Sequence, residues 1–219
     1  MSLSNQNRAK LAGEFAVIVI GVLVALWIDA GWNWMQDRQD EQVLLMDLRA
    51  DFEENYTRVQ ETIESHRLSR ETGARFVRGG VDAFSADSLN EMGRRLVTLE
   101  TFNPRMGALE SAISSGHIDL LRDDDLRAAL AAWSGYVTDA VEEVEWAVPT
   151  NIRLVEPTAA KWVRGEPPLI VWSQLEEDPE WLNLLGLKII ALTAAQEDSE
   201  ALLAQTERIL AILRAATDQ

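Results

Sequence analysis

The chain has 219 residues and a formal net charge of −16, because 36 aspartates and glutamates outweigh 20 lysines and arginines. Such an excess of negative charge repels nucleic acid, so we expect no nucleic-acid partner. Cysteine is absent, which excludes a disulfide framework and thiol chemistry, and the two histidines form no metal-binding cluster in the sequence.

The first element along the chain is an apolar run from Phe15 to Ile28 behind a short basic N-terminus. These residues alone would span about 21 Å as a helix, short of the ~30 Å hydrocarbon core. Weakly polar flanks extend the segment, which predicts a transmembrane helix over residues 11–35 after a tail of residues 1–10. A cleaved signal peptide and a buried helix of a soluble protein remain alternatives, although Asp29 directly after the apolar run disfavours cleavage.

Charged and aromatic residues at the two ends of this segment predict its orientation. Basic residues precede the segment and mostly acidic residues follow Met35, so the positive-inside rule places the N-terminus in the cytoplasm. We therefore expect a protein of the bacterial inner membrane, with residues 36–219 forming an acidic periplasmic or extracytoplasmic domain. Indole rings favour the headgroup level of a bilayer. The predicted membrane-interface anchors are Arg8, Lys10, Trp27, Trp32 and Trp34.

One face of the predicted membrane helix combines small and ionisable residues. Gly21 and Ala25 form a small-x-x-x-small pair, which lets another helix approach closely. Glu14 lies on the same stripe, and an ionisable residue within a membrane segment is a functional hypothesis; alternatively, Glu14 is solvated at the cytoplasmic interface. We expect a second copy of the chain or another membrane protein to contact the face made of Glu14, Ile18, Gly21, Ala25 and Asp29.

Beyond the membrane segment, apolar residues recur at intervals of three and four, which predicts helices rather than strands. The first helix is expected to continue to about His66 and to persist to Val77, before Gly79 and Gly80 end it. Whether this helix is hinged near Ala30 stays open. Its predicted apolar stripe consists of Leu45, Leu48, Phe52, Val59 and Ile63.

Two shorter helices are predicted next. The first covers Ser88–Leu99, and Pro104 then suits the first turn of the second. Gly116 is placed to be the left-handed residue that ends this second helix. Its predicted apolar side consists of Met106, Leu109 and Ile113.

Capping signals define the remaining helices. The aspartates at 123–125 predict the start of a helix that Pro149 ends or kinks. Residues 150–163 are expected to be helical, 165–168 to form a loop, and 169–172 to form a short strand or extended segment. Asp178 and Pro179 predict the start of the last helix, whose weakly apolar middle, residues 194–201, faces solvent or bends.

The predicted fold class is therefore all-α: an N-terminal transmembrane helix that continues into an antiparallel bundle of long helices. The first and last helices are the longest, so we expect them to pair and to project from the bilayer.

Two parts of the sequence resemble a known family. The first part comprises Gly13–Glu14, Val19–Leu23, Ala25–Leu26 and Trp32–Asn33, and the second comprises Phe102–Leu109, Ser115–Ile118, Leu120–Arg122, Leu126 and Trp133. They resemble a family of uncharacterised bacterial membrane proteins that have one N-terminal membrane helix and an external domain of unknown function. The resemblance covers about half of the chain. It implies an anchored helical domain and transfers no catalytic residues.

No pattern in the sequence indicates catalysis or metal binding. His117 follows a predicted helix end, where the helix dipole and capping explain it, and we expect His66 to be exposed in a charged stretch. The aspartates at 123–125 lack the spacing of a calcium loop, and the glutamates at 142–145 are typical of a solvated helix surface. We therefore expect no catalytic, cofactor-binding or metal-binding residues and no cofactor, although an enzyme remains possible.

Two functions fit these observations. The first is a non-catalytic scaffold or accessory subunit that docks through its membrane helix and external bundle. The second is a force- or signal-coupling subunit that uses Glu14 with an integral membrane partner.

Overall fold

The computed structural model describes residues 3–157, 163–164, 169–170 and 172–218. Helices make up nearly all of this part of the chain, so the predicted all-α class is confirmed. The other elements of the described residues are three short 3₁₀ helices and two short strands, and they do not alter the class.

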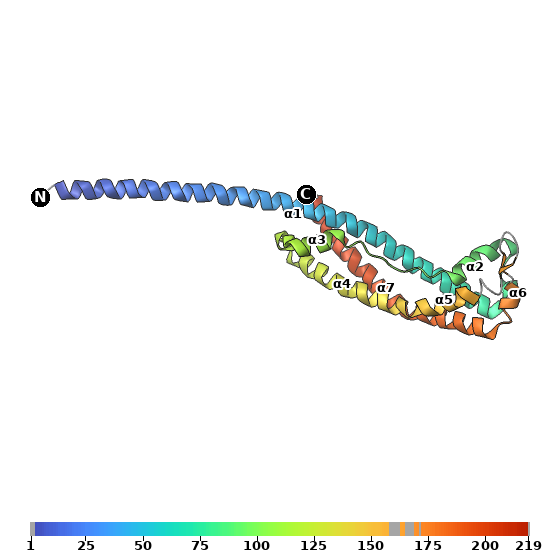
Figure 1. Cartoon of the computed structure of the whole chain (residues 1–219). Coiled ribbons are helices and arrows are strands. Elements are labelled where there is room, and N and C mark those ends of the chain that lie inside the picture. The colour runs from blue at the N-terminus through green and yellow to red at the C-terminus, as the bar shows by residue number, and fades with distance from the viewer. Residues whose placement is uncertain (1–2, 158–162, 165–168, 171, 219) are drawn as a thin grey trace.

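A single helix, α1, runs without a break from Leu3 to Gly79 (Figure 1). Its 77 residues correspond to about 115 Å at 1.5 Å per residue. The backbone stays helical through Ala30, so the open question of a hinge there is answered by a continuous helix. The predicted end is confirmed: Gly80 adopts a left-handed φ of 55°, and its N–H donates to the Phe76 carbonyl at 2.8 Å.

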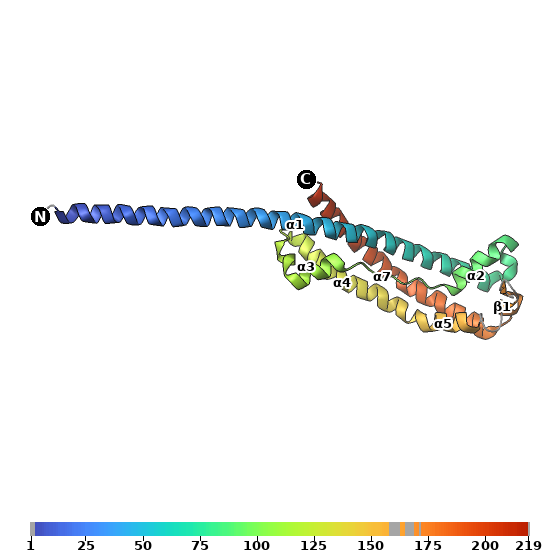
Figure 2. The ribbon, with the colours of Figure 1, turned by 45° about the horizontal axis from the view of Figure 1, so that its top comes forward.

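Short elements follow at the far end of α1. Two 3₁₀ turns, η1 (Val81–Ala83) and η2 (Ala86–Ser88), lead into α2 (Leu89–Val97), which lies within the predicted helix. Residues 98–106 then form an extended connection, called here the crossover segment. It runs back along the bundle between α2 and α3 (Figure 2).

The third α-helix, α3 (Gly107–Ser115), begins three residues later than Pro104 suggested. Gly116 ends it with a φ of 78°, as predicted, and η3 (His117–Leu120) follows. The expected apolar side of α3 is wrong at Ile113, which is exposed, whereas Leu109 and Ala112 are buried. The helix therefore buries the face that carries Leu109 and turns Ile113 to the outside.

The predicted start and kink of the next helical region are both present. The Asp123 carboxylate accepts the Leu126 N–H at 2.9 Å and caps α4 (Asp124–Glu145). The helix breaks before α5 (Ala147–Pro157) because the ring of Pro149 would clash with the Glu145 carbonyl four residues earlier. In α5, Pro149 occupies the first turn, where a missing N–H costs nothing.

The segment after α5 differs in part from prediction. The helix expected over residues 150–163 is wrong at its end, because Val163 pairs with Ile170 in a short antiparallel ribbon of β1 (Val163–Arg164) and β2 (Leu169–Ile170). This ribbon confirms the short strand expected at 169–172, although Trp172 already begins α6 (Trp172–Leu175). Residues 158–162 and the predicted loop 165–168 lie outside the described residues.

The last helix, α7 (Pro179–Thr217), begins as predicted. The Asp178 carboxylate accepts the N–H groups of Glu180 and Trp181 at 3.0 and 3.2 Å, and Pro179 stands at the first helical position.

Helix α7 lies along α1 and runs in the opposite direction (Figures 1 and 2). Near one end, Arg49 Nη1 donates to Thr217 Oγ1 at 2.7 Å. Toward the other end, a Cβ added at Gly73 would lie 3.1 Å from the side chain of Ile189. The C-terminal end of α7 therefore returns to the part of α1 that borders the exposed apolar segment.

Two separate apolar cores hold these helices together. The core nearer the exposed apolar segment of α1 includes Leu48, Phe52, Leu130, Trp133 and Leu210, and the distal core includes Phe76, Leu96, Leu154, Trp181 and Leu185. Each core contains a buried tryptophan that packs on a phenylalanine of α1: ring centroids lie 4.7 Å apart for Phe52 and Trp133, and 5.4 Å apart for Phe76 and Trp181.

Between the two cores lies a zone of buried polar side chains, called here the waist. The described waist comprises Thr62, His66, Ser69, Lys188 and Ser199, all at most 7% exposed. The expectation that residues 194–201 face solvent or bend is wrong at Ala195 and Ser199, because α7 continues unbroken and buries both. Ala195 and Ser199 stand on the inward face of α7 where other turns carry leucine. Their side chains are smaller, and a cavity lies beside Ser199.

Candidate functional site

The predicted membrane contact face lies on the free N-terminal part of α1. Within the described residues, α1 is the one helix that is long and apolar enough there to cross a membrane. Ile18, Gly21, Ala25 and Asp29 are all exposed, and a Cβ added at Gly21 would meet nothing within 4 Å. Glu14 belongs to the same helix, but its side chain lies outside the described ones. The face is thus open along its described length.

The predicted interface tryptophans lie on this same exposed stretch. Trp27 and Trp32 contact no packed domain, whereas Trp34 has two arginines over its ring: the guanidinium carbons of Arg38 and Arg122 lie 5.7 and 5.5 Å from the ring centroid. The predicted basic anchors Arg8 and Lys10 fall within α1, but their side chains lie outside the described ones.

Glu41 fastens the near end of the bundle to α1, a role that the sequence did not reveal. Its side chain is 7% exposed, and Oε1 accepts the Arg122 N–H at 3.0 Å. Its other carboxylate oxygen lies 3.5 Å from both Arg38 Nη1 and Arg122 Nε. The loop before α4 is therefore fixed to α1 a short distance beyond the exposed apolar segment.

Side chains from α1, α5 and α7 donate hydrogen bonds to backbone carbonyls in the last turn of α2 and in the crossover segment. Carbonyl oxygens in such a partly buried position must find donors, because an unpaired one costs free energy. The contacts to successive carbonyls are Ser69 to Arg95 (2.8 Å), Lys188 to Leu96 (3.0 Å), Asn151 to Val97 (3.0 Å), Lys188 to Thr98 (2.6 Å), His66 to Glu100 (2.8 Å) and Arg58 to Asn103 (3.0 Å).

Asn55 completes this series and explains why α3 starts late. Its side-chain amide donates to the Arg105 carbonyl at 2.8 Å and accepts the Arg105 N–H at 2.7 Å. Both backbone groups of Arg105 are thereby engaged outside a helix. Asp51, one turn earlier on α1, then caps α3 by accepting the Ala108 N–H at 2.9 Å.

The prediction that His66 is exposed is wrong. The imidazole is 7% exposed because it faces the crossover segment, where Nε2 lies 2.8 Å from the Glu100 carbonyl. A carbonyl only accepts, so Nε2 carries the hydrogen. Burial lowers the pKa of His66, and the nearby charge of Lys188 lowers it further. The ring is therefore neutral at pH 7. His117, by contrast, is exposed next to the left-handed Gly116.

Lys188 is a buried cation that forms no ion pair among the residues that the structure describes. Its Nζ donates to the Leu96 and Thr98 carbonyls and to Asn151 Oδ1 at 2.8 Å, so three acceptors match its three hydrogens. Burial nevertheless lowers the pKa of Lys188 to about 8. This group joins α7, α5 and the crossover segment at one point.

The polar groups gathered in the waist thus serve mainly to hold backbone. Within the described residues, no group of three or more histidines and carboxylates is placed to hold a metal ion. A cavity of about 320 Å³ lies beside these contacts, between α1, α4, α7 and the crossover segment.

Comparisons with known proteins return no match: no family model, no curated protein and no solved structure is similar to this chain. The family resemblance and the membrane contact face therefore stay predictions.

Removing the Asn55 amide should destabilise the domain. Asn55→Ala leaves both backbone groups of Arg105 unpaired, which should lower the free energy of unfolding by about 2–4 kcal/mol. The measurement is denaturant unfolding of the full chain in mild detergent. Asn103→Ala, on the same segment with an exposed side chain, is the control and should change stability by less than about 0.5 kcal/mol. An equal decrease in the free energy of unfolding for both variants would contradict the role assigned to Asn55.

Lys188 should make stability depend on pH above neutrality. Since its pKa is about 8 when folded and near 10.5 when unfolded, the unfolded state binds more protons between these values. The free energy of unfolding should therefore rise with pH across this range, by up to ~1.4 kcal/mol per pH unit. Lys188→Met should remove this dependence on pH. The test is the difference in free energy of unfolding between wild type and variant, measured from pH 7 to 10. A difference that stays constant would refute the shifted pKa.

Proposed function

We propose that this chain is a non-catalytic, single-pass membrane protein that serves as a scaffold or accessory subunit. The observation that carries the proposal is the unbroken helix α1, which joins an exposed apolar segment directly to a packed domain. Such a helix holds the domain at a fixed place relative to whatever its membrane part contacts.

The use of polar groups in the domain supports a non-catalytic role. Lys188, His66 and Asn55 are the buried groups best suited to chemistry, and each is engaged with backbone. A catalytic base or acid needs access to substrate, whereas these contacts fix the crossover segment.

The arrangement in the membrane follows from charge and geometry. We propose that the N-terminus lies in the cytoplasm of a bacterium and that residues 36–219 stand in the periplasm as an antiparallel bundle. The pairing of Arg49 with Asp218 supports this, because it returns the end of α7 to the membrane-proximal part of α1. The tryptophans at 27, 32 and 34 support an outer interface at that level.

The proposed partners are the bilayer and, at the Gly21/Ala25 face, a second copy of the chain or another membrane protein. Gly21 is open on all sides, so a neighbouring helix backbone can approach closely there.

Gly21→Leu should dissociate the complex. Its side chain would hold the partner helix away, and we expect an apparent dissociation constant at least ~10-fold higher, equivalent to about 1.4 kcal/mol. The measurement is the mass of the tagged chain after extraction in mild detergent. Leu23→Phe, on the opposite side of α1, adds bulk without touching the face and should leave the mass unchanged. An unchanged mass for Gly21→Leu would remove the support for this contact.

A second candidate function is coupling of force or signal to an integral membrane partner through Glu14. The unbroken helix favours it, since a movement of the domain would reach Glu14 without a hinge. Glu14→Gln should then abolish function in the host while leaving the amount of protein and its extracted mass unchanged. Glu71→Gln, exposed on the same helix in the domain, is the control. Full function of the Glu14→Gln chain would exclude this role.

A further inference from the structure

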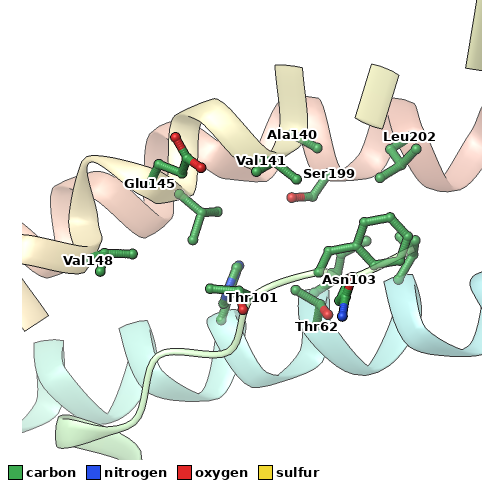
Figure 3. A pocket seen from close by; sticks show the side chains of 14 residues that line it. Thr62, Thr101, Asn103, Ala140, Val141, Glu145, Val148, Ser199 and Leu202 are labelled. Atoms are coloured by element: carbon green, nitrogen blue, oxygen red, sulfur yellow. The ribbon is translucent and has the colours of Figure 1, made fainter. Parts of the chain in front are cut away.

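The cavity in the waist has the size and lining of a small-molecule site. Its volume is about 320 Å³, which falls in the range of ligand pockets. Apolar side chains from α4 and α7 form much of its wall, among them Val141, Val144 and Leu202, and the crossover segment closes one side with Thr101 (Figure 3).

Two hydroxyl groups open onto this cavity from side chains that are themselves largely buried. Thr62 on α1 is 7% exposed and Ser199 on α7 is 6% exposed. Within the described part of the chain, neither hydroxyl has a hydrogen-bond partner. By contrast, the Thr206 hydroxyl, which lies on the same helix as Ser199, donates to the Leu202 carbonyl at 2.7 Å. Figure 3 shows Thr62 and Ser199 on opposite sides of the space. Because both hydroxyls face the cavity and no described protein group occupies their hydrogen-bonding capacity, they are available to a ligand.

The charges around the cavity exclude an anion. Among the described residues that line it there is neither lysine nor arginine, and Glu145 supplies the charged group, a carboxylate at the rim. His66 also lines it and is neutral at pH 7, because burial lowers its pKa. A carboxylate or phosphate ligand would therefore find no positive partner, and the net charge of the chain would repel it.

We propose that the waist cavity binds a small amphipathic molecule with an apolar body and a hydroxyl or amine head group, either uncharged or cationic. The head group hydrogen-bonds to Thr62 and Ser199, and the body packs on Val141, Val144 and Leu202. This site does not depend on the membrane role proposed above.

Three probes of similar shape test the class of ligand: 2-phenylethanol, 2-phenylethylammonium and 3-phenylpropionate. Each is titrated calorimetrically into the full chain in mild detergent, with detergent alone as the blank. The alcohol and the amine should bind saturably with one site per chain, and the carboxylate at least ~10-fold more weakly. Absence of saturable binding by both the alcohol and the amine, or equal binding of the carboxylate, would overturn the proposal.

Two conservative variants test the site itself. Thr62→Val and Ser199→Ala each remove a hydroxyl that is unpaired in the free protein, so unfolding stability should be unchanged or higher. Affinity for 2-phenylethanol should nevertheless fall about 3- to 10-fold in each variant, because one hydrogen bond to the ligand is lost. Thr57→Val, at an exposed position of α1, is the control and should bind like wild type. Unaltered affinity in both cavity variants would place binding elsewhere.

Discussion

The architecture depends on one constraint: an extended backbone segment laid along a helical bundle must have its carbonyl groups paired. α1 meets this need with Asn55, His66 and Ser69, and α7 meets it with Lys188. Because these partners are fixed on rigid helices, the crossover segment has one path along the bundle. That path sets where α3 begins, closes one side of the waist cavity, and ties the short distal helix α2 to the long ones. The domain thus uses buried polar residues to position chain rather than to react.

The same helix carries both the exposed apolar N-terminal segment and one side of the packed domain. Its apolar side chains divide between two cores, with Phe52 in one and Phe76 in the other, and its polar residues between them face the waist. An occupant of the waist would touch α1 at Thr62, roughly midway along the part of the helix that is packed. A change in packing at the waist would therefore act on the same helix that carries the exposed apolar segment.

Local signals in the sequence predicted the ends of the helices, and distant contacts account for the errors. Asp123, Asp178 and Gly116 act within one helical turn, so their roles could be read from neighbouring residues alone. The burial of His66 and Lys188 could not, because their partners lie 34 and 92 residues away in sequence. The late start of α3 has the same origin in Asn55. The membrane face around Gly21 lies on an exposed helix, so it remains a prediction from residue type and spacing.

The pairing of α1 with α7 also sets the order of events during synthesis. The stripe formed by Leu48, Phe52 and Val59 leaves the ribosome with α1, but Leu202, Ile209 and Leu213, which share its core, belong to the final helix. At typical translation speeds the interval between them is on the order of ten seconds. During that time the apolar stripe of α1 has no α7 of its own chain to pack against, and the α7 of another copy can pack there instead. The topology therefore permits one specific misassembly, the exchange of this last helix between copies.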